Sequence, residues 1–175
     1  MDFGLNDEHR MIVESVRSFV EEELYPHEEE VEATDHARPE LIEQIKQKSL
    51  EMGFYAANMP ESLGGGGLDT VSLTLLEREL GRASFALQYA VARPSNILQA
   101  CTGDQIENYL LPTIRGEKVD CLAMTEPGAG SDVRSMICKA EKDGDDYVIN
   151  GIKHFISHAD VADYVILFAA TGEEE

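Results

Sequence analysis

Residues 124–132, MTEPGAGSD, combine small residues with hydroxyl groups and could bind a ligand by hydrogen bonding. The small residues 128–130 let the backbone approach a ligand closely, and Thr125 and Ser131 add a hydroxyl on either side. Such groups can hold carbonyl, hydroxyl or phosphate oxygens, although the stretch contains no lysine or arginine. The sequence therefore indicates a binding loop that needs no cation, or a plain connecting loop in which Pro127 sets a turn.

Two phosphate-binding loops with known patterns do not fit these residues. A nucleotide P-loop needs a lysine and a hydroxyl residue at the start of a helix, and a dinucleotide-binding fingerprint needs G-x-G-x-x-G between a strand and a helix. The stretch has one G-x-G, and the residues that follow it, 133–144, read as a strand. Both nucleotide-binding patterns are therefore excluded.

Other reactive side chains favour structural interpretations. Glu126 could act as an acid or base, but a carboxylate in a turn is more often structural. His154 and His158 have the spacing of a metal pair, yet the strand-like context offers no third ligand, so we expect no metal site. Arg82 and Arg93 could contact a phosphate, but pairing with the abundant surface acids is the simpler expectation.

The composition is that of a globular protein with a core. Hydrophobic residues make up 43% of the 175 residues and charged residues 27%, which excludes a disordered chain. The 34 acids and 14 bases give a net charge of -20, which argues against nucleic acid and anionic membranes as partners. The longest apolar run, 164–170, is too short to span a membrane, and the N-terminus lacks a signal segment, so we expect a cytoplasmic protein. The three cysteines are expected to be reduced, buried thiols: Cys101, Cys121 and Cys138.

Helix signals begin at the N-terminus. Apolar residues recur at helical spacing over 7–24, and Pro26 ends the pattern. The acidic run 27–35 is expected to be a solvated, mobile face. Pro39 suits the first turn of a second helix, which ends where Gly53 can take the left-handed conformation.

Three further helices are expected before residue 116. Asp69 is placed to cap the first of them. Residues 84–92 are apolar nearly all round, which is typical of a helix inside a bundle. Thr102 and Gln105 form a capping-box pair at the start of the last helix, and Pro112 is expected to end it.

Strand signals replace helix signals at about residue 116, which separates an N-terminal helical domain, 1–117, from a β domain, 118–175. Asp143-Gly144 and Asn150-Gly151 each predict a hairpin turn. An antiparallel sheet of so few strands leaves an open apolar edge, so we expect the chain to end inside its second domain. The expected strands are 119–124, 135–142, 147–149, 152–156 and 164–170.

The segment CLAMTEPGAGSDVRS, 121–135, resembles the acyl-CoA dehydrogenase family of flavoproteins when it is taken with three other segments. These are PESLGGGGLD at 60–69, ERELGRAS at 77–84 and GIKHFIS at 151–157, and the resemblance extends along the whole chain. It implies an all-α helical bundle over 1–117, followed over 118–175 by the first strands of an antiparallel β-barrel-like middle domain with the flavin-binding loop. The C-terminal helical domain of the family would be absent.

The resemblance also implies a set of ligand-binding residues. Thr125 would hydrogen-bond the flavin ring of FAD, and Ser131 would lie at the acyl-CoA substrate. The family's usual Trp-Ile-Thr triplet is Phe155-Ile156-Ser157 here; this keeps an apolar wall and a hydroxyl but loses an indole N–H, which puts the flavin's redox tuning in doubt. The implied cofactor-binding residues are Leu122, Ala123, Met124, Thr125, Gly130, Ser131, Phe155, Ile156 and Ser157.

The activity that the resemblance implies is an oxidoreductase reaction of fatty acid metabolism. An acyl-CoA thioester would lose its α and β hydrogens to give the 2,3-enoyl-CoA, with hydride transfer to flavin N5. The family's catalytic base is a glutamate of the C-terminal domain, so the 175 residues by themselves are expected to be inactive. The implied partners are acyl-CoA and an electron-transfer flavoprotein or similar acceptor, in a homotetramer of the full-length protein. Two alternatives remain: an acyl-CoA oxidase or flavin monooxygenase of the same fold, and a catalytically silent helical interaction module.

Overall fold

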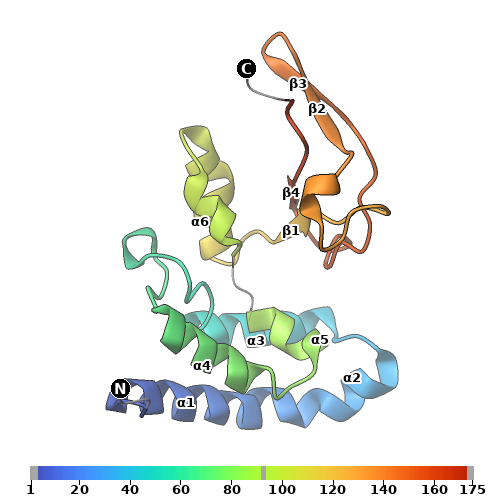
Figure 1. The fold of residues 1–175 in the computed structure, drawn as a ribbon. Helices are drawn as coiled ribbons and strands as arrows, with labels where there is room; N and C mark the ends of the chain where they lie inside the picture. Colours follow the sequence, from blue (N-terminus) through green and yellow to red (C-terminus); the bar gives the residue numbers. More distant parts are fainter. Residues whose placement is uncertain (1–3, 92–93, 173–175) are drawn as a thin grey trace. The chain divides into compact units, whose positions relative to one another are not determined.

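The computed structural model of the chain describes residues 4–91 and 94–172. It divides into two compact units, Met1–Glu117 and Lys118–Glu175, which are drawn in blue to yellow and in yellow to red in Figure 1. The first unit is helical and the second contains the strands, so the fold is an α-helical domain followed by a few β-strands. In the part of the chain that the structure describes, no helix is long and apolar enough to cross a membrane.

The first predicted helix is present and continues further than expected. Helix α1, Asp7–Phe19, begins at Asn6, whose side chain accepts a hydrogen bond from the His9 amide. It continues as a π-helical turn, Val20–Leu24, and a 3-10 turn, Tyr25–His27, which contains Pro26.

The acidic run that follows forms a helix that the sequence did not predict; that this face is mobile stays a prediction. Helix α2 spans Glu28–Thr34. Three of its four glutamates, Glu28, Glu29 and Glu30, lie in the first turn, where the helix dipole favours negative charge, and Val31 is buried. The Glu28 carboxylate also accepts a hydrogen bond from the Ser84 amide at 2.7 Å. These contacts order a segment whose composition is typical of a solvated loop.

The next two helices agree with their sequence signals. Helix α3, Pro39–Glu51, has Pro39 in its first turn, and Gly53 beyond its end takes a φ of 73°. Helix α4, Thr70–Leu80, is capped by Asp69, whose carboxylate accepts a hydrogen bond from the Ser72 amide at 2.7 Å.

The remaining two predicted helices differ from their expected bounds. Residues 85–91 form α5, Phe85–Gln88, and a 3-10 turn, Tyr89–Val91, while residue 92 lies outside the described residues. The Gln105 side chain accepts from the Thr102 amide, which is half of the predicted capping box. A π-helical turn, Ile106–Leu110, then leads into α6, Leu111–Ile114. Pro112 lies in the first turn of α6, directly after the π-helical turn, and does not end the helix, which continues to Ile114.

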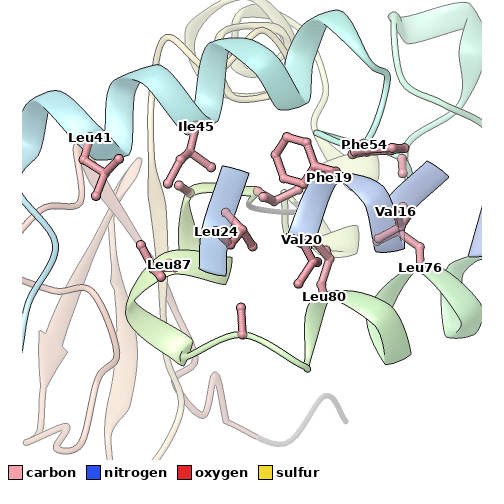
Figure 2. Packing of buried hydrophobic residues seen from close by; sticks show 14 of the residues in the cluster. Val16, Phe19, Val20, Leu24, Leu41, Ile45, Phe54, Leu76, Leu80 and Leu87 are labelled. Atoms are coloured by element: carbon pink, nitrogen blue, oxygen red, sulfur yellow. The ribbon is translucent and has the colours of Figure 1, made fainter. Parts of the chain in front are cut away.

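One hydrophobic core joins the longer helices of the first unit. Figure 2 shows side chains of α1 and its π-helical turn packed with side chains of α3, α4 and α5. Phe19 and Phe54 meet edge to face, with ring centroids 5.4 Å apart. The most deeply buried side chains of the core include Val16, Val20, Leu24, Ile45, Leu76 and Leu87.

The strands of the second unit form two pairs, and the described residues form no closed barrel. Strands β2, Lys139–Asp143, and β3, Asp146–Asn150, form the hairpin that Asp143-Gly144 predicts. Strand β1, Asp120–Ala123, pairs with β4, Tyr164–Leu167, in parallel, whereas the sequence predicted antiparallel pairing throughout.

Three other expectations for this unit were wrong. Residues 152–156 are not a strand, and Asn150-Gly151 forms no hairpin. The backbone at Gly151 instead lies so close to Cys138 that a Cβ there would be 2.5 Å from the Cys138 Cβ. Strand β2 begins only at Lys139, after a 3-10 turn, Val133–Ser135.

Candidate functional site

Pro127 sets a tight turn in the middle of the candidate loop. The Glu126 amide donates to the Ala129 carbonyl at 3.0 Å, and the Ala129 amide donates back to the Glu126 carbonyl at 3.2 Å. A Cβ added at Gly128 or Gly130 would meet no atom within 4 Å, so both glycines face open space. The two backbone hydrogen bonds between Glu126 and Ala129 therefore hold the turn together, while the backbone at Gly128 and Gly130 is open to a ligand.

The Glu126 side chain is buried and accepts hydrogen bonds from three donors. The amides of Ile137 and Cys138 donate at 2.7 and 3.0 Å, and the Lys153 ammonium donates at 2.8 Å. The hydrogen bond from Lys153, followed by that from the Ile137 amide, lowers the pKa of the Glu126 carboxyl. These contacts keep Glu126 ionised and fully engaged, which supports a structural role over a role as acid or base.

Lys153 ties this loop to the segment that carries the aromatic triplet. Its ammonium donates to the Met124 carbonyl at 2.9 Å as well as to Glu126. The next residue continues the contact, because the His154 amide donates to the Thr125 carbonyl at 3.0 Å. The structure thus brings together two of the segments that the sequence singles out.

Phe155 stands out in both backbone and exposure. Its φ is 56°, a left-handed value that is rare for a bulky residue, and its side chain is 86% exposed. The His154 ring lies beside it, with ring centroids 4.0 Å apart and planes at 36°. An aromatic side chain is therefore presented to solvent next to the Thr125 loop.

The predicted site residues differ in what they can offer a ligand. Ala123 is buried, and its carbonyl accepts from the Phe168 amide at 3.0 Å, whereas Leu122 is 39% exposed. Met124 and Ile156 are half-buried. Among the described residues, the hydroxyls of Thr125, Ser131 and Ser157 and the amides of Gly130 and Ser131 have no hydrogen-bond partner.

Not all of these residues are connected. Within the ranges that the structure describes, no hydrogen bond joins Gly130 or Ser131 to residues 155–157. Lys153 and the left-handed Phe155 were missed by the sequence reasoning, although a single lysine among the apolar and aromatic residues of GIKHFIS was a signal for a buried partner.

The remaining candidates have structural surroundings. Arg82 pairs with Glu21 at 3.1 Å and with Glu79 at 3.5 Å, as expected, while Arg93 lies outside the described residues. Cys121 and Cys138 are buried free thiols, and Cys101 is half-buried. Across residues 4–91 and 94–172, no group of three or more His, Cys, Asp or Glu side chains could hold a metal ion.

Comparison with known families agrees with both units. The model of the acyl-CoA dehydrogenase N-terminal domain matches residues 6–117, and the model of the acyl-CoA dehydrogenase middle domain matches residues 121–175. The chain belongs to the acyl-CoA dehydrogenase family. The boundary between the two matches falls where the helical unit ends and the strands begin.

Individual members of the acyl-CoA dehydrogenase family match along nearly the whole chain. A benzylmalonyl-CoA dehydrogenase of Aromatoleum aromaticum is 37% identical over 180 residues, covering 100% of this chain and 47% of that protein. The caffeyl-CoA reductase-Etf complex subunit CarC of Acetobacterium woodii is 36% identical, covering 95% of this chain and 44% of that protein. A glutaryl-CoA dehydrogenase from Mycobacterium smegmatis in complex with FADH2 has a TM-score of 0.81 and 26% identity, covering 95% and 43% of the two chains. The chain spans about half the length of these relatives.

Proposed function

We propose that this chain contributes the flavin-binding loop of an FAD-dependent dehydrogenase of acyl-CoA thioesters. The product would be the 2,3-enoyl-CoA. The observation that carries the proposal is the joining of Thr125 to the segment of Phe155 by the hydrogen bond from the His154 amide. This contact joins Thr125, whose hydroxyl has no partner among the described residues, to the segment that carries the exposed Phe155 ring. A solved FADH2 complex of a similar protein supports a flavin as the ligand.

The residues present fit a flavin. Thr125 and Ser157 have hydroxyls with no hydrogen-bond partner among the described residues, and Phe155 offers an exposed apolar ring. A flavin ring has a polar edge and flat apolar faces, so it needs such a mixture of hydrogen-bonding groups and an aromatic wall. When bound, FAD would supply the acceptor for the hydride that the substrate loses.

The chain's own residues would bind and shield rather than carry protons. Thr125 would hold the flavin edge, and residues 155–157 would form a wall that keeps water from one side of the site. Ser131, which is exposed beside the open face of the turn, would contact the acyl-CoA substrate. We assign no catalytic base, because the one buried carboxylate of the loop, Glu126, is already fully engaged.

The proposed partners follow from the same likeness. CarC is named as a subunit of a reductase-Etf complex, which supports an electron-transfer flavoprotein or a similar protein as the electron acceptor. We also propose that the full protein forms the homotetramer expected from the family resemblance. An acyl-CoA thioester is the proposed substrate.

The experiment is a titration of the full protein with FAD in the Thr125→Val variant. Valine has nearly the shape of threonine but leaves a flavin acceptor unpaired, so FAD affinity should fall about tenfold. Thr102→Val, at an exposed threonine of the helical unit, is the matched control and should change nothing. Equal FAD affinity and equal reduction potential in wild type and Thr125→Val would remove Thr125 from the site.

Activity is tested separately with a panel of acyl-CoA thioesters and an artificial electron acceptor. Formation of the 2,3-enoyl-CoA is expected from the full protein. A well-folded full protein that shows no flavin absorbance and no turnover would contradict the proposed function.

A further inference from the structure

The backbone of Phe155 is held in a conformation that its own side chain does not explain. A left-handed φ of 56° is sterically unfavourable for phenylalanine, and such strain persists only where surrounding contacts impose it. The Phe155 side chain is 86% exposed, so packing of the ring in a core cannot impose it. The residues that precede Phe155 are held by contacts that can impose this conformation.

Those residues are fixed at three consecutive contacts. The backbone of Gly151 lies against Cys138, with room for no Cβ. The Lys153 side chain is only 8% exposed, and its ammonium is bound to Glu126 and to the Met124 carbonyl. The His154 amide is bound to the Thr125 carbonyl. These contacts therefore fix the position and direction of the backbone that leads into Phe155.

The Glu126 carboxylate binds the Lys153 ammonium and also holds a third stretch of the chain. Its side chain is 0% exposed, and it also accepts hydrogen bonds from two consecutive amides, those of Ile137 and Cys138. The carboxylate thus connects three stretches of chain that are distant in sequence: the 126–129 turn, residues 137–138 and residues 151–154.

A buried ion pair is not required for stability alone. Replacing such a pair by apolar residues of similar volume is often neutral or stabilising, because both charges must be desolvated. Charge-assisted hydrogen bonds do, however, fix the direction and distance of the groups they join. The buried Glu126–Lys153 ion pair is therefore better explained by the geometry that it fixes than by a contribution to stability.

We propose that the Glu126–Lys153 ion pair is a positioning device, which holds residues 151–154 against the Thr125 loop and so imposes the left-handed backbone that presents the Phe155 ring. That the Phe155 ring faces a flavin rests on the proposed function. That the ion pair controls the Phe155 backbone does not depend on it. Glu126 and Lys153 act through Phe155 and are positioning residues. Neither needs to touch the cofactor.

The backbone part is tested by comparing Phe155→Gly with Phe155→Ala in two backgrounds of the full protein. In the presence of the ion pair, the glycine variant should unfold at a temperature about 2 °C higher than the alanine variant, because only glycine takes the left-handed conformation without strain. In the Lys153→Met background the difference should vanish or reverse, because a relaxed backbone favours alanine. An undiminished advantage of glycine in Lys153→Met would overturn the proposal.

Three further variants serve as the alternative background and the controls for this comparison. If Lys153→Met does not fold, Glu126→Gln serves as the background, since it keeps the shape of the side chain and removes its charge. Lys153→Arg keeps the charge and should restore the glycine advantage. Lys142→Met, at an exposed lysine of β2, is the control and should leave the advantage unchanged.

The flavin part is read from the visible circular dichroism of bound FAD and from its affinity. Lys153→Met should change the spectrum and weaken FAD binding at least tenfold, while Lys153→Arg and Lys142→Met should match wild type. An unchanged spectrum and affinity in Lys153→Met would overturn the role toward the flavin. A wild-type protein that binds no FAD would instead contradict the proposed function and leave the glycine and alanine comparison fully interpretable.

Discussion

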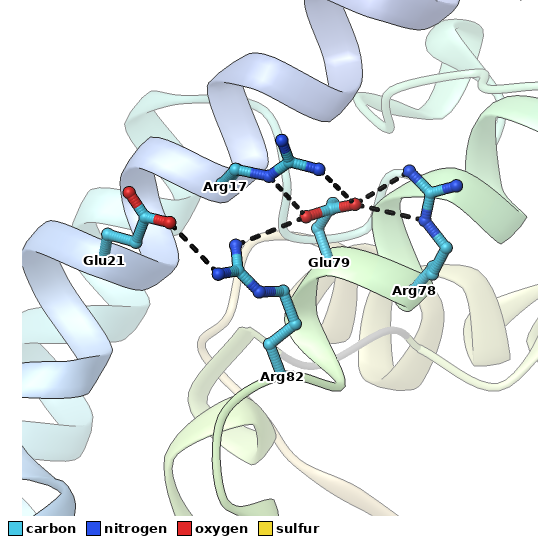
Figure 3. Close-up of polar contacts among 5 residues, drawn as sticks. All are labelled: Arg17, Glu21, Arg78, Glu79 and Arg82. Atoms are coloured by element: carbon cyan, nitrogen blue, oxygen red, sulfur yellow. Dashed lines mark hydrogen bonds and ion pairs between the residues drawn. The ribbon is translucent and has the colours of Figure 1, made fainter.

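The guanidinium of Arg17 on α1 donates two hydrogen bonds to the buried carboxylate of Glu79 on α4, at 3.0 and 3.2 Å. Two more arginines converge on the same group: Arg78 at 2.8 Å and Arg82 at 3.5 Å (Figure 3). The Glu79 side chain is only 3% exposed, whereas the Arg17 and Arg78 side chains are about half exposed. A single carboxylate therefore balances three charges where α1 and α4 pack together.

Replacing this carboxylate should destabilise the helical unit. Glu79→Gln keeps the volume but leaves arginines without their charged partner, so we expect a loss of about 2 kcal/mol in the free energy of unfolding. Urea unfolding followed by far-ultraviolet circular dichroism measures it. Glu32→Gln, at an exposed position of α2, is the control and should stay within about 0.5 kcal/mol of wild type. A Glu79→Gln protein as stable as this control would contradict the prediction.

The same group predicts a difference in acid stability. The hydrogen bond from Arg17, assisted by Arg78, lowers the pKa of Glu79 in the folded protein. Its contribution to stability is therefore fully present above the unfolded value of about 4.3 and is lost as pH falls through the lower folded pKa. We expect the stability gap between wild type and Glu79→Gln to be constant from pH 7 to about pH 5 and to narrow below it. A gap that does not change down to pH 3 would show that Glu79 does not titrate in this way.

Local signals predicted the helices well where they included a cap. Asp69 begins α4 and Pro39 begins α3 because caps and prolines act on their own turn. Residues 28–34 were missed because their order depends on distant contacts, such as that between Glu28 and the Ser84 amide. Composition alone cannot reveal a partner that lies more than fifty residues away in the sequence.

The candidate site shows the same limit. Residues 135–142 were predicted as one strand, but the amides of Ile137 and Cys138 donate to the Glu126 carboxylate and so are not available to a sheet. Asn150-Gly151 has the composition of a hairpin turn, but close packing of Gly151 on Cys138 takes precedence over it. The motifs could be recognised from the sequence, whereas the ion pair that joins them could not.

Gly151 should tolerate no side chain. A Cβ there would lie 2.5 Å from the Cys138 Cβ and 2.6 Å from its Cα, so the two segments must separate in Gly151→Ala. We expect a loss of roughly 1–3 kcal/mol in stability and, in the full protein, weaker FAD binding. Thermal unfolding and FAD titration measure the two effects. Gly128→Ala is the control for thermal unfolding, since a Cβ at that position meets no atom of the protein within 4 Å; an equal loss of stability in the two variants would contradict the close packing.

A polypeptide limited to residues 1–175 should fold its helical unit but should not retain FAD. Every residue of β3 is exposed, including the consecutive apolar side chains of Tyr147, Val148 and Ile149 at 56%, 48% and 50%. Exposed apolar strands favour self-association over a preorganised cofactor site, so we expect binding of a hydrophobic dye and concentration-dependent aggregation. Val148→Lys should reduce both, because a charge on an exposed strand opposes pairing between copies.

The measurement is gel filtration of this polypeptide after incubation with FAD, followed by absorbance of the protein peak and an assay with a panel of acyl-CoA thioesters. Helical circular dichroism should persist, because the core of the first unit is built from its own helices. Flavin should elute separately, and no thioester should be oxidised, because a polypeptide without bound flavin has no acceptor for the hydride. Stoichiometric FAD in the protein peak would show that residues 1–175 suffice for the cofactor site, and turnover would return Glu126 to consideration as the base despite its three hydrogen bonds.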